Sequence, residues 1–96
     1  MKMFLIVYSS AADTYVISAL KKAGIAQYTK MEEVHGEGTE TEPKLGTHTW
    51  PGENKALFVA ISNEKVFLLT DILKQLKNEH PRAGVRGFIL PMEECV

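Results

Sequence analysis

The stretch GEGTETEPKLGTHTWPGENK, residues 36–55, decides how the rest of this 96-residue chain can fold. It contains four of the seven glycines, two of the four prolines and the only tryptophan, and its only large apolar side chains are Leu45 and Trp50. Segments of this length without an apolar period are uncommon in compact domains, where they are usually functional loops or disordered. We therefore expect a long exposed loop, which the flanking segments hold as a small scaffold.

The amino-acid composition limits the classes of protein to which the chain can belong. With 45% hydrophobic and 24% charged residues, the chain is typical of a globular protein, and we expect a single domain over residues 1–96. Eleven basic and twelve acidic side chains leave a net charge of −1, which gives no electrostatic attraction for nucleic acid or an anionic membrane. The single cysteine, Cys95, cannot form an internal disulfide, and the first apolar run is too short for a signal peptide or a membrane span. We expect a cytoplasmic protein without membrane insertion.

Three elements are predicted before the loop. The run MFLIVY at residues 3–8 is continuously apolar, which is typical of a central strand buried on both faces. Capping side chains at residues 10–13 and apolar residues at helical spacing predict a helix that ends at Gly24, because glycine readily takes the left-handed conformation that closes helices. A second strand is predicted over residues 26–35, although its alternation of apolar and polar residues is imperfect.

Three more elements are predicted after the loop. The run ALFVAI at residues 56–61 predicts a third strand. Residues 62–63 can cap a second helix, whose apolar stripe continues until Pro81 forbids further helix. The run VRGFIL at residues 85–90 predicts a fourth strand that Pro91 stops.

The order of these elements predicts the fold. Strand, helix, strand, long loop, strand, helix, strand is the pattern of an α+β protein with the ferredoxin-like βαββαβ sandwich. In that fold two helices cover one face of a four-stranded antiparallel sheet. Since no segment remains to cover the other face, we expect a partner subunit there, in a closed symmetric homo-oligomer.

Three segments carry a resemblance to a known family. They read KMFLIVYSS at residues 2–10, GIAQYTKMEEVHGEG at residues 24–38 and HPRAGVRGFILPMEE at residues 80–94. The second resembles the signature of PII signalling proteins, and all three are similar to the superfamily of PII and CutA proteins. The resemblance implies a cytoplasmic ferredoxin-like homotrimer with small-molecule sites in the clefts between subunits. It also implies that the long loop is a T-loop, which changes shape to engage a client protein.

The resemblance also implies particular site residues. Three positions match those that contact a nucleotide in PII proteins, and three match the B-loop that receives phosphates: Thr29, Gly36 and Gly38, then Arg82, Gly84 and Arg86. The chain departs from the pattern after Gly38, where Glu40 stands in place of a neutral side chain and repels phosphate charge. The loop also contains no tyrosine that could be modified. We therefore interpret the chain as a divergent PII-like protein.

The chemistry of these residues allows more than one role. Arg82 and Arg86 can each grip two oxygens of a phosphate or carboxylate, although two surface arginines that balance Glu93 and Glu94 would look the same. Gly36 and Gly38 can expose backbone N–H groups to an anion or can simply form a turn. The sequence leaves both alternatives open.

The loop itself contains candidate metal ligands and an unusual indole. His35 and His48, together with the carboxylates at Glu37, Glu40 and Glu42, would suit zinc or copper if the loop brought them together. Their spacing matches no fixed metal motif, and a solvated acidic loop has the same composition. Trp50, two residues after His48, either anchors the loop on its own trimer or contacts a partner.

Two hypotheses follow. The first is a PII-like trimeric regulator that binds a small anionic ligand, such as an adenine nucleotide, between subunits and controls a client protein through the 36–55 loop. The second is a CutA-like trimer that binds divalent metal or is structural. No Gly-x-Ser-x-Gly elbow, P-loop or paired nucleophile and base occurs, so we do not expect an enzyme.

Overall fold

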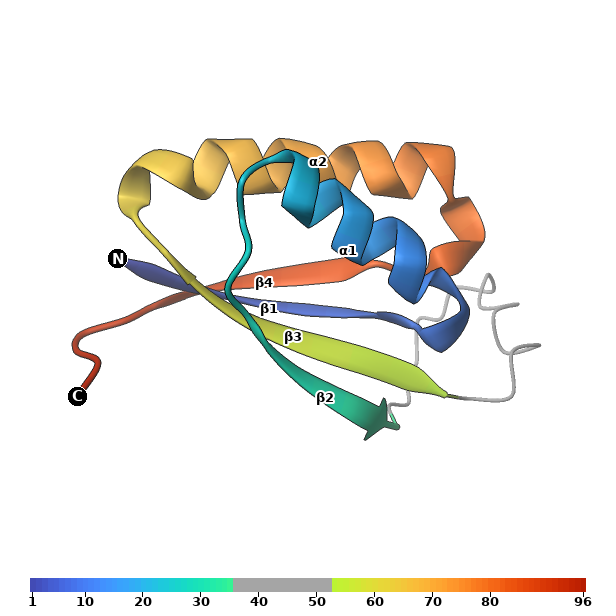
Figure 1. The fold of residues 1–96 in the computed structure, drawn as a ribbon, viewed down its shortest axis with the longest axis horizontal. Helices are drawn as coiled ribbons and strands as arrows, with labels where there is room; N and C mark the ends of the chain where they lie inside the picture. The colour runs from blue at the N-terminus through green and yellow to red at the C-terminus, as the bar shows by residue number, and fades with distance from the viewer. Residues whose placement is uncertain (36–52) are drawn as a thin grey trace.

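A computed structural model describes residues 1–35 and 53–96. The fold is the expected ferredoxin-like α+β sandwich, in which both helices lie on one face of a four-stranded antiparallel sheet (Figure 1). Within these residues, short 3₁₀ turns join the main elements. The elements in chain order are β1 (Lys2–Ser9), η1 (Ser10–Ala12), α1 (Asp13–Lys22), β2 (Thr29–Val34), β3 (Asn54–Ile61), η3 (Asn63–Lys65), α2 (Val66–Glu79), η4 (Pro81–Ala83) and β4 (Arg86–Pro91).

The sheet has the strand order β2-β3-β1-β4, with β2 and β4 at the edges. Its register places Leu5 of β1 between Phe58 of β3 and Phe88 of β4. Directly paired residues of neighbouring strands lie on the same face, and successive residues of one strand alternate between faces. The pairing therefore assigns each paired strand residue to the helix-covered face or to the opposite face.

The hydrophobic core lies between the sheet and the helices. The buried residues of β1 and β3 mostly alternate along each strand, except at the adjacent pairs Tyr8–Ser9 and Ala56–Leu57. Both helices bury their apolar stripes over them, and the principal core residues are Phe4, Ile6, Tyr8, Leu57, Val59, Val16, Leu20, Leu69, Leu73 and Leu76. Gly87 of β4 lies directly under Leu73, where a Cβ atom would collide with the leucine side chain. The glycine thus lets α2 approach the sheet closely.

The opposite face of the sheet carries apolar side chains that no described element covers. Phe58 is 40% exposed and Phe88 is 48% exposed, and between them lies Leu5, which is partly exposed. The prediction that β1 is buried on both faces is therefore wrong for a single chain, because the helices cover only one face. Side chains of β1 that point away from the helices, such as Leu5, stay accessible.

Several predicted boundaries also shift. β2 begins at Thr29 rather than at residue 26, and β3 begins at Asn54, so the predicted loop loses its last two residues to the sheet. Pro91 is the last residue of β4 rather than the residue after it, since an edge strand tolerates a missing N–H donor. The expected closure of the first helix at Gly24 is confirmed by its φ of 80°.

The helix starts differ from the prediction because a 3₁₀ turn precedes each helix. Ser9, rather than a side chain at residues 10–13, caps the first turn by accepting a hydrogen bond from the N–H of Ala11 at 3.4 Å. Ser62 occupies the cap position of η3, but its side chain makes no capping hydrogen bond. Among the described residues, no helix combines the length and the apolar character required to cross a bilayer.

Candidate ligand-binding site

One end of the sheet gathers several of the predicted site residues. The β1–α1 turn and η4 both lie at this end, next to the start of β4 (Figure 1). The last residue of β1, Ser9, pairs with Asn54 at the start of β3, and Asn54 also pairs with Val34 at the end of β2. The connection between β2 and β3 therefore leaves and re-enters the sheet at this end.

The arginine-containing turn lies at the same end. Pro81 opens η4, and Gly84 follows it in the left-handed conformation with a φ of 64°. Arg82 and Arg86 flank this glycine, and both are exposed to solvent. The turn and the first residue of β4 thus present two permanently charged guanidinium groups that can bind an anion.

Thr29 lies far from these arginines within one chain. Thr29 begins β2 and is level with Phe58, Leu5 and Phe88, whereas Arg86 is on β4 at the opposite edge of the sheet. Both residues belong to the face that the helices leave uncovered. Three strand spacings separate the two edges, which is about 14 Å. A single chain therefore does not bring Thr29 and Arg86 to the same group of a small ligand.

Several other predicted site residues lie outside the described part of the chain. They are Gly36, Gly38, His48 and Trp50, so their predicted roles stay predictions. His35 is described, and it is exposed directly after β2. In residues 1–35 and 53–96, no three His, Cys, Asp or Glu side chains form a group that could hold a metal ion. The metal hypothesis stays a prediction, because its other histidine is not among these residues.

A polar network that the sequence did not reveal joins three elements. The Tyr8 hydroxyl donates a 2.6 Å hydrogen bond to Oδ1 of Asp13, and Nζ of Lys30 lies 3.0 Å from Oδ2 of the same carboxylate. The network therefore connects the end of β1, the start of α1 and β2. Only the sheet register places Lys30 on the helix side of β2, so no spacing in the sequence indicates this contact.

The network shifts the pKa of two of its members. Burial, followed by the hydrogen bond and the charge of Asp13, raises the pKa of Tyr8 well above its usual value. Burial alone would raise the pKa of Asp13, but the hydrogen bonds from Tyr8 and Lys30 outweigh it, so the pKa lies below its usual value. Asp13 is therefore a carboxylate and Tyr8 a neutral donor at neutral pH.

A second ion pair and a bulge lie further along β2. Lys55 of β3 contacts Oε1 of Glu32, and this contact raises the pKa of Lys55. The pairing with β3 shifts between Met31 and Val34, so that one extra residue of β2 is accommodated there. Such bulges increase the local twist of a strand and redirect its side chains. β2 is therefore irregular close to the point where it leaves the sheet.

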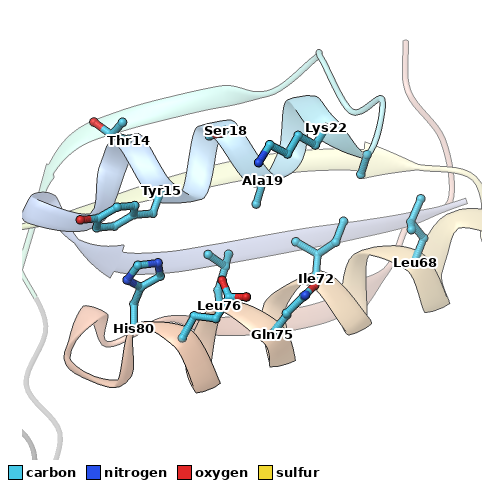
Figure 2. A pocket seen from close by; sticks show the side chains of 12 residues that line it. Thr14, Tyr15, Ser18, Ala19, Lys22, Leu68, Ile72, Gln75, Leu76 and His80 are labelled. Carbon is cyan, nitrogen blue, oxygen red and sulfur yellow. The ribbon is translucent and has the colours of Figure 1, made fainter.

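Two hollows lie beside the helices, and one of them includes the predicted ligand residue Arg82. One has a volume of about 480 Å³ and runs between α1 and α2 (Figure 2). At one end of it the rings of Tyr15 and His80 are stacked, with centroids 3.9 Å apart. The other hollow, of about 470 Å³, is also lined by Tyr15 and His80 and includes Arg82. The sequence indicates neither hollow, because α1 and α2 are distant in the chain.

Comparisons with known proteins agree with this fold. The model of the family described as nitrogen regulatory protein P-II matches residues 1–96, so the chain belongs to the P-II family. The expected family and fold are thereby confirmed. A comparison with curated proteins gave no match.

Similar solved structures carry PII-like descriptions. The apo form of CPII from Thiomonas intermedia K12, a nitrogen regulatory PII-like protein, is 16% identical over 92% of this chain and 84% of its own, with a TM-score of 0.67. The same protein bound to ADP, AMP and bicarbonate is 15% identical over 99% and 94%, also with a TM-score of 0.67. A proposed PII-like signalling protein from Thermus thermophilus is 26% identical over 92% and 81%, with a TM-score of 0.61.

Proposed function

We propose that the protein is a trimeric regulator that binds a small anionic ligand in the clefts between its subunits. Binding then controls a client protein through the segment that joins β2 to β3. Membership of a family of regulatory proteins supports the class of function. The trimer and the site residues Thr29, Arg82 and Arg86 come from the resemblance to PII proteins, and the geometry of the described residues supports them.

The position of Thr29 and Arg86 carries this proposal. They lie at opposite edges of one sheet but on the same uncovered face. A cyclic assembly that packs these faces together brings the β2 edge of one chain near the β4 edge of the next. A ligand between two chains can then contact both residues.

The uncovered face supports self-association. Phe58 and Phe88 leave large aromatic surface in contact with water in a single chain, and Leu5 continues this surface across β1. Burial of apolar surface is the dominant favourable term in most protein association. A homotrimer that covers this face would remove the aromatic surface from water.

The charge of the turn after α2 indicates the chemical class of ligand. Arg82 and Arg86 suit a phosphate or a carboxylate, and the backbone at Gly84 allows a close approach. CPII is described as bound to ADP and AMP, which makes adenine nucleotides the first ligands to test. We propose that the ligand orders the β2–β3 connection, and that the protein acts in the cytoplasm without being an enzyme.

Isothermal titration calorimetry with ADP, AMP and bicarbonate tests the proposal. ADP is expected to bind, and Arg82→Ala is expected to weaken binding by at least about tenfold, because a hydrogen bond to a charged group is worth about 1.5–3 kcal/mol. Lys74→Ala is the matched control, since it removes an exposed cation from α2 on the helical layer. The proposal fails if none of the three ligands gives heat with the wild-type protein. An equal loss of affinity in both variants would remove the site assignment.

A further inference from the structure

β2 is weakly fixed by the core, although it carries a proposed ligand residue. Thr29 begins this strand, and the β2–β3 connection leaves from its other end. As an edge strand, β2 is paired only with β3, and that pairing is interrupted by the bulge. None of its six residues is buried. Apolar burial therefore contributes little to its position.

Asp13 provides a polar connection from β2 to the interior of the protein. Tyr8 is 0% exposed, so core packing fixes the place of its hydroxyl. That hydroxyl donates a hydrogen bond to one oxygen of Asp13, and Nζ of Lys30 donates to the other oxygen. Lys30 directly follows Thr29 in β2. The Asp13 carboxylate thus fixes β2 relative to the packed core.

The turn before Asp13 is also fixed by a hydrogen bond to the residue before β3. The N–H of Ser10 donates a 3.0 Å hydrogen bond to the carbonyl of Glu53, which directly precedes β3. Ser9 and Ala12 also line the hollow that includes Arg82. Asp13 therefore lies between Lys30 of β2 and the turn that borders both the arginine side of the proposed site and the start of β3.

We infer that Asp13 is a positioning residue for the proposed ligand site, which acts by fixing β2, and with it Thr29, through Lys30. The inference rests on the proposed function for its effect on ligand affinity. Its effect on β2 itself is independent of any ligand. The two effects are therefore measured separately.

The test uses Asp13→Asn, which keeps a hydrogen-bond acceptor for Tyr8 but removes the negative charge that holds Lys30. We expect ADP affinity to fall about fivefold, as the loss of one partly buried ion pair allows. Amide hydrogen exchange at residues 30–34 is expected to become about fivefold faster. Lys30→Met should have the same effects, and the double variant should be no worse than either single variant. Lys30→Arg should retain the wild-type values, because a guanidinium can bind the same carboxylate.

Ile72→Val is the control for a general loss of stability. Ile72 is a partly buried residue of α2, and this change lowers the stability of the core by removing one methyl group on a different element from β2. Ile72→Val should leave the ADP affinity unchanged. It should also not accelerate amide exchange at residues 30–34 more than in the rest of the sheet. A loss of ADP affinity in Ile72→Val equal to that in Asp13→Asn would overturn the inference, because the effect would then follow stability alone.

The remaining outcomes separate this inference from the proposed function. If wild-type protein binds ADP and Asp13→Asn binds it equally well, the inference is overturned while the proposed function stands. If the wild-type protein binds none of ADP, AMP and bicarbonate, the proposed function fails. Hydrogen exchange alone then tests whether Asp13 positions β2. Faster exchange confined to residues 30–34 in Asp13→Asn then supports the positioning role, and unchanged exchange overturns it.

Discussion

Phe88→Asp should dissociate the proposed trimer while leaving the fold of each chain intact. Phe88 lies on the uncovered face of the sheet and is 48% exposed in a single chain. A buried aromatic side chain covers about 200 Å², so about 100 Å² of Phe88 is left for a partner to cover. At about 25 cal/mol per Å², its burial contributes about 2.5 kcal/mol per subunit. A carboxylate at this position removes that contribution and adds the cost of desolvating a charge.

Sedimentation velocity at micromolar concentration measures the result, with far-ultraviolet circular dichroism as a test of the fold. Phe67→Asp is the matched control, because Phe67 is 81% exposed on α2, in the helical layer. We expect Phe88→Asp to be a folded monomer and Phe67→Asp to remain a trimer. A trimeric Phe88→Asp protein, or a monomeric wild-type protein, would refute the role of this face.

Three further predictions concern the stability of single chains and are measured by chemical denaturation. Because the pKa of Asp13 is lowered in the folded protein, its carboxylate stabilises the fold at a pH above its ordinary pKa. This contribution is lost as the pH falls below about 4. Asp13→Asn should therefore lose less free energy of unfolding than the wild type over the same pH range. Gly87→Ala should destabilise by about 1–3 kcal/mol through its collision with Leu73, and adding Leu73→Ala should cost less than it does in the wild type. Gly84→Ala should cost about 1 kcal/mol because its φ is positive, and Gly84→Asn should cost less; equal effects would contradict the backbone explanation.

The fold was largely predictable because its signals are local. Apolar runs predicted β1, β3 and β4, and Gly24 takes the conformation that its place after α1 indicated. The errors have the same origin. The residues on the two faces of β1 are apolar alike, so the sequence does not distinguish the helix-covered face from the other. A continuous apolar run is typical of a strand that is covered on both faces. The sequence therefore predicted burial that a single chain does not provide.

The candidate site was only partly predictable because its parts are joined by the sheet rather than by sequence. The arginines around Gly84 were predicted from the resemblance of residues 80–94 to PII proteins, and they lie close together in the sequence, one in η4 and one at the start of β4. The connection from Tyr8 through Asp13 to Lys30 was missed, since it depends on the register of β2 and on the place where α1 begins. The separation of Thr29 from Arg86 follows from the strand order, which no local pattern specifies.

The central claim is that the ligand site is assembled from two chains. Thr29→Glu and Arg86→Glu should each abolish ADP binding, because each places a carboxylate beside the anionic ligand. When equal amounts of the two variants are unfolded and refolded together, random assembly leaves about a quarter of the clefts without either substitution. Calorimetry should then recover ADP binding at about a quarter of the wild-type number of sites. A mixture that binds no ADP, although each variant is a folded trimer and the wild type binds, would contradict the account.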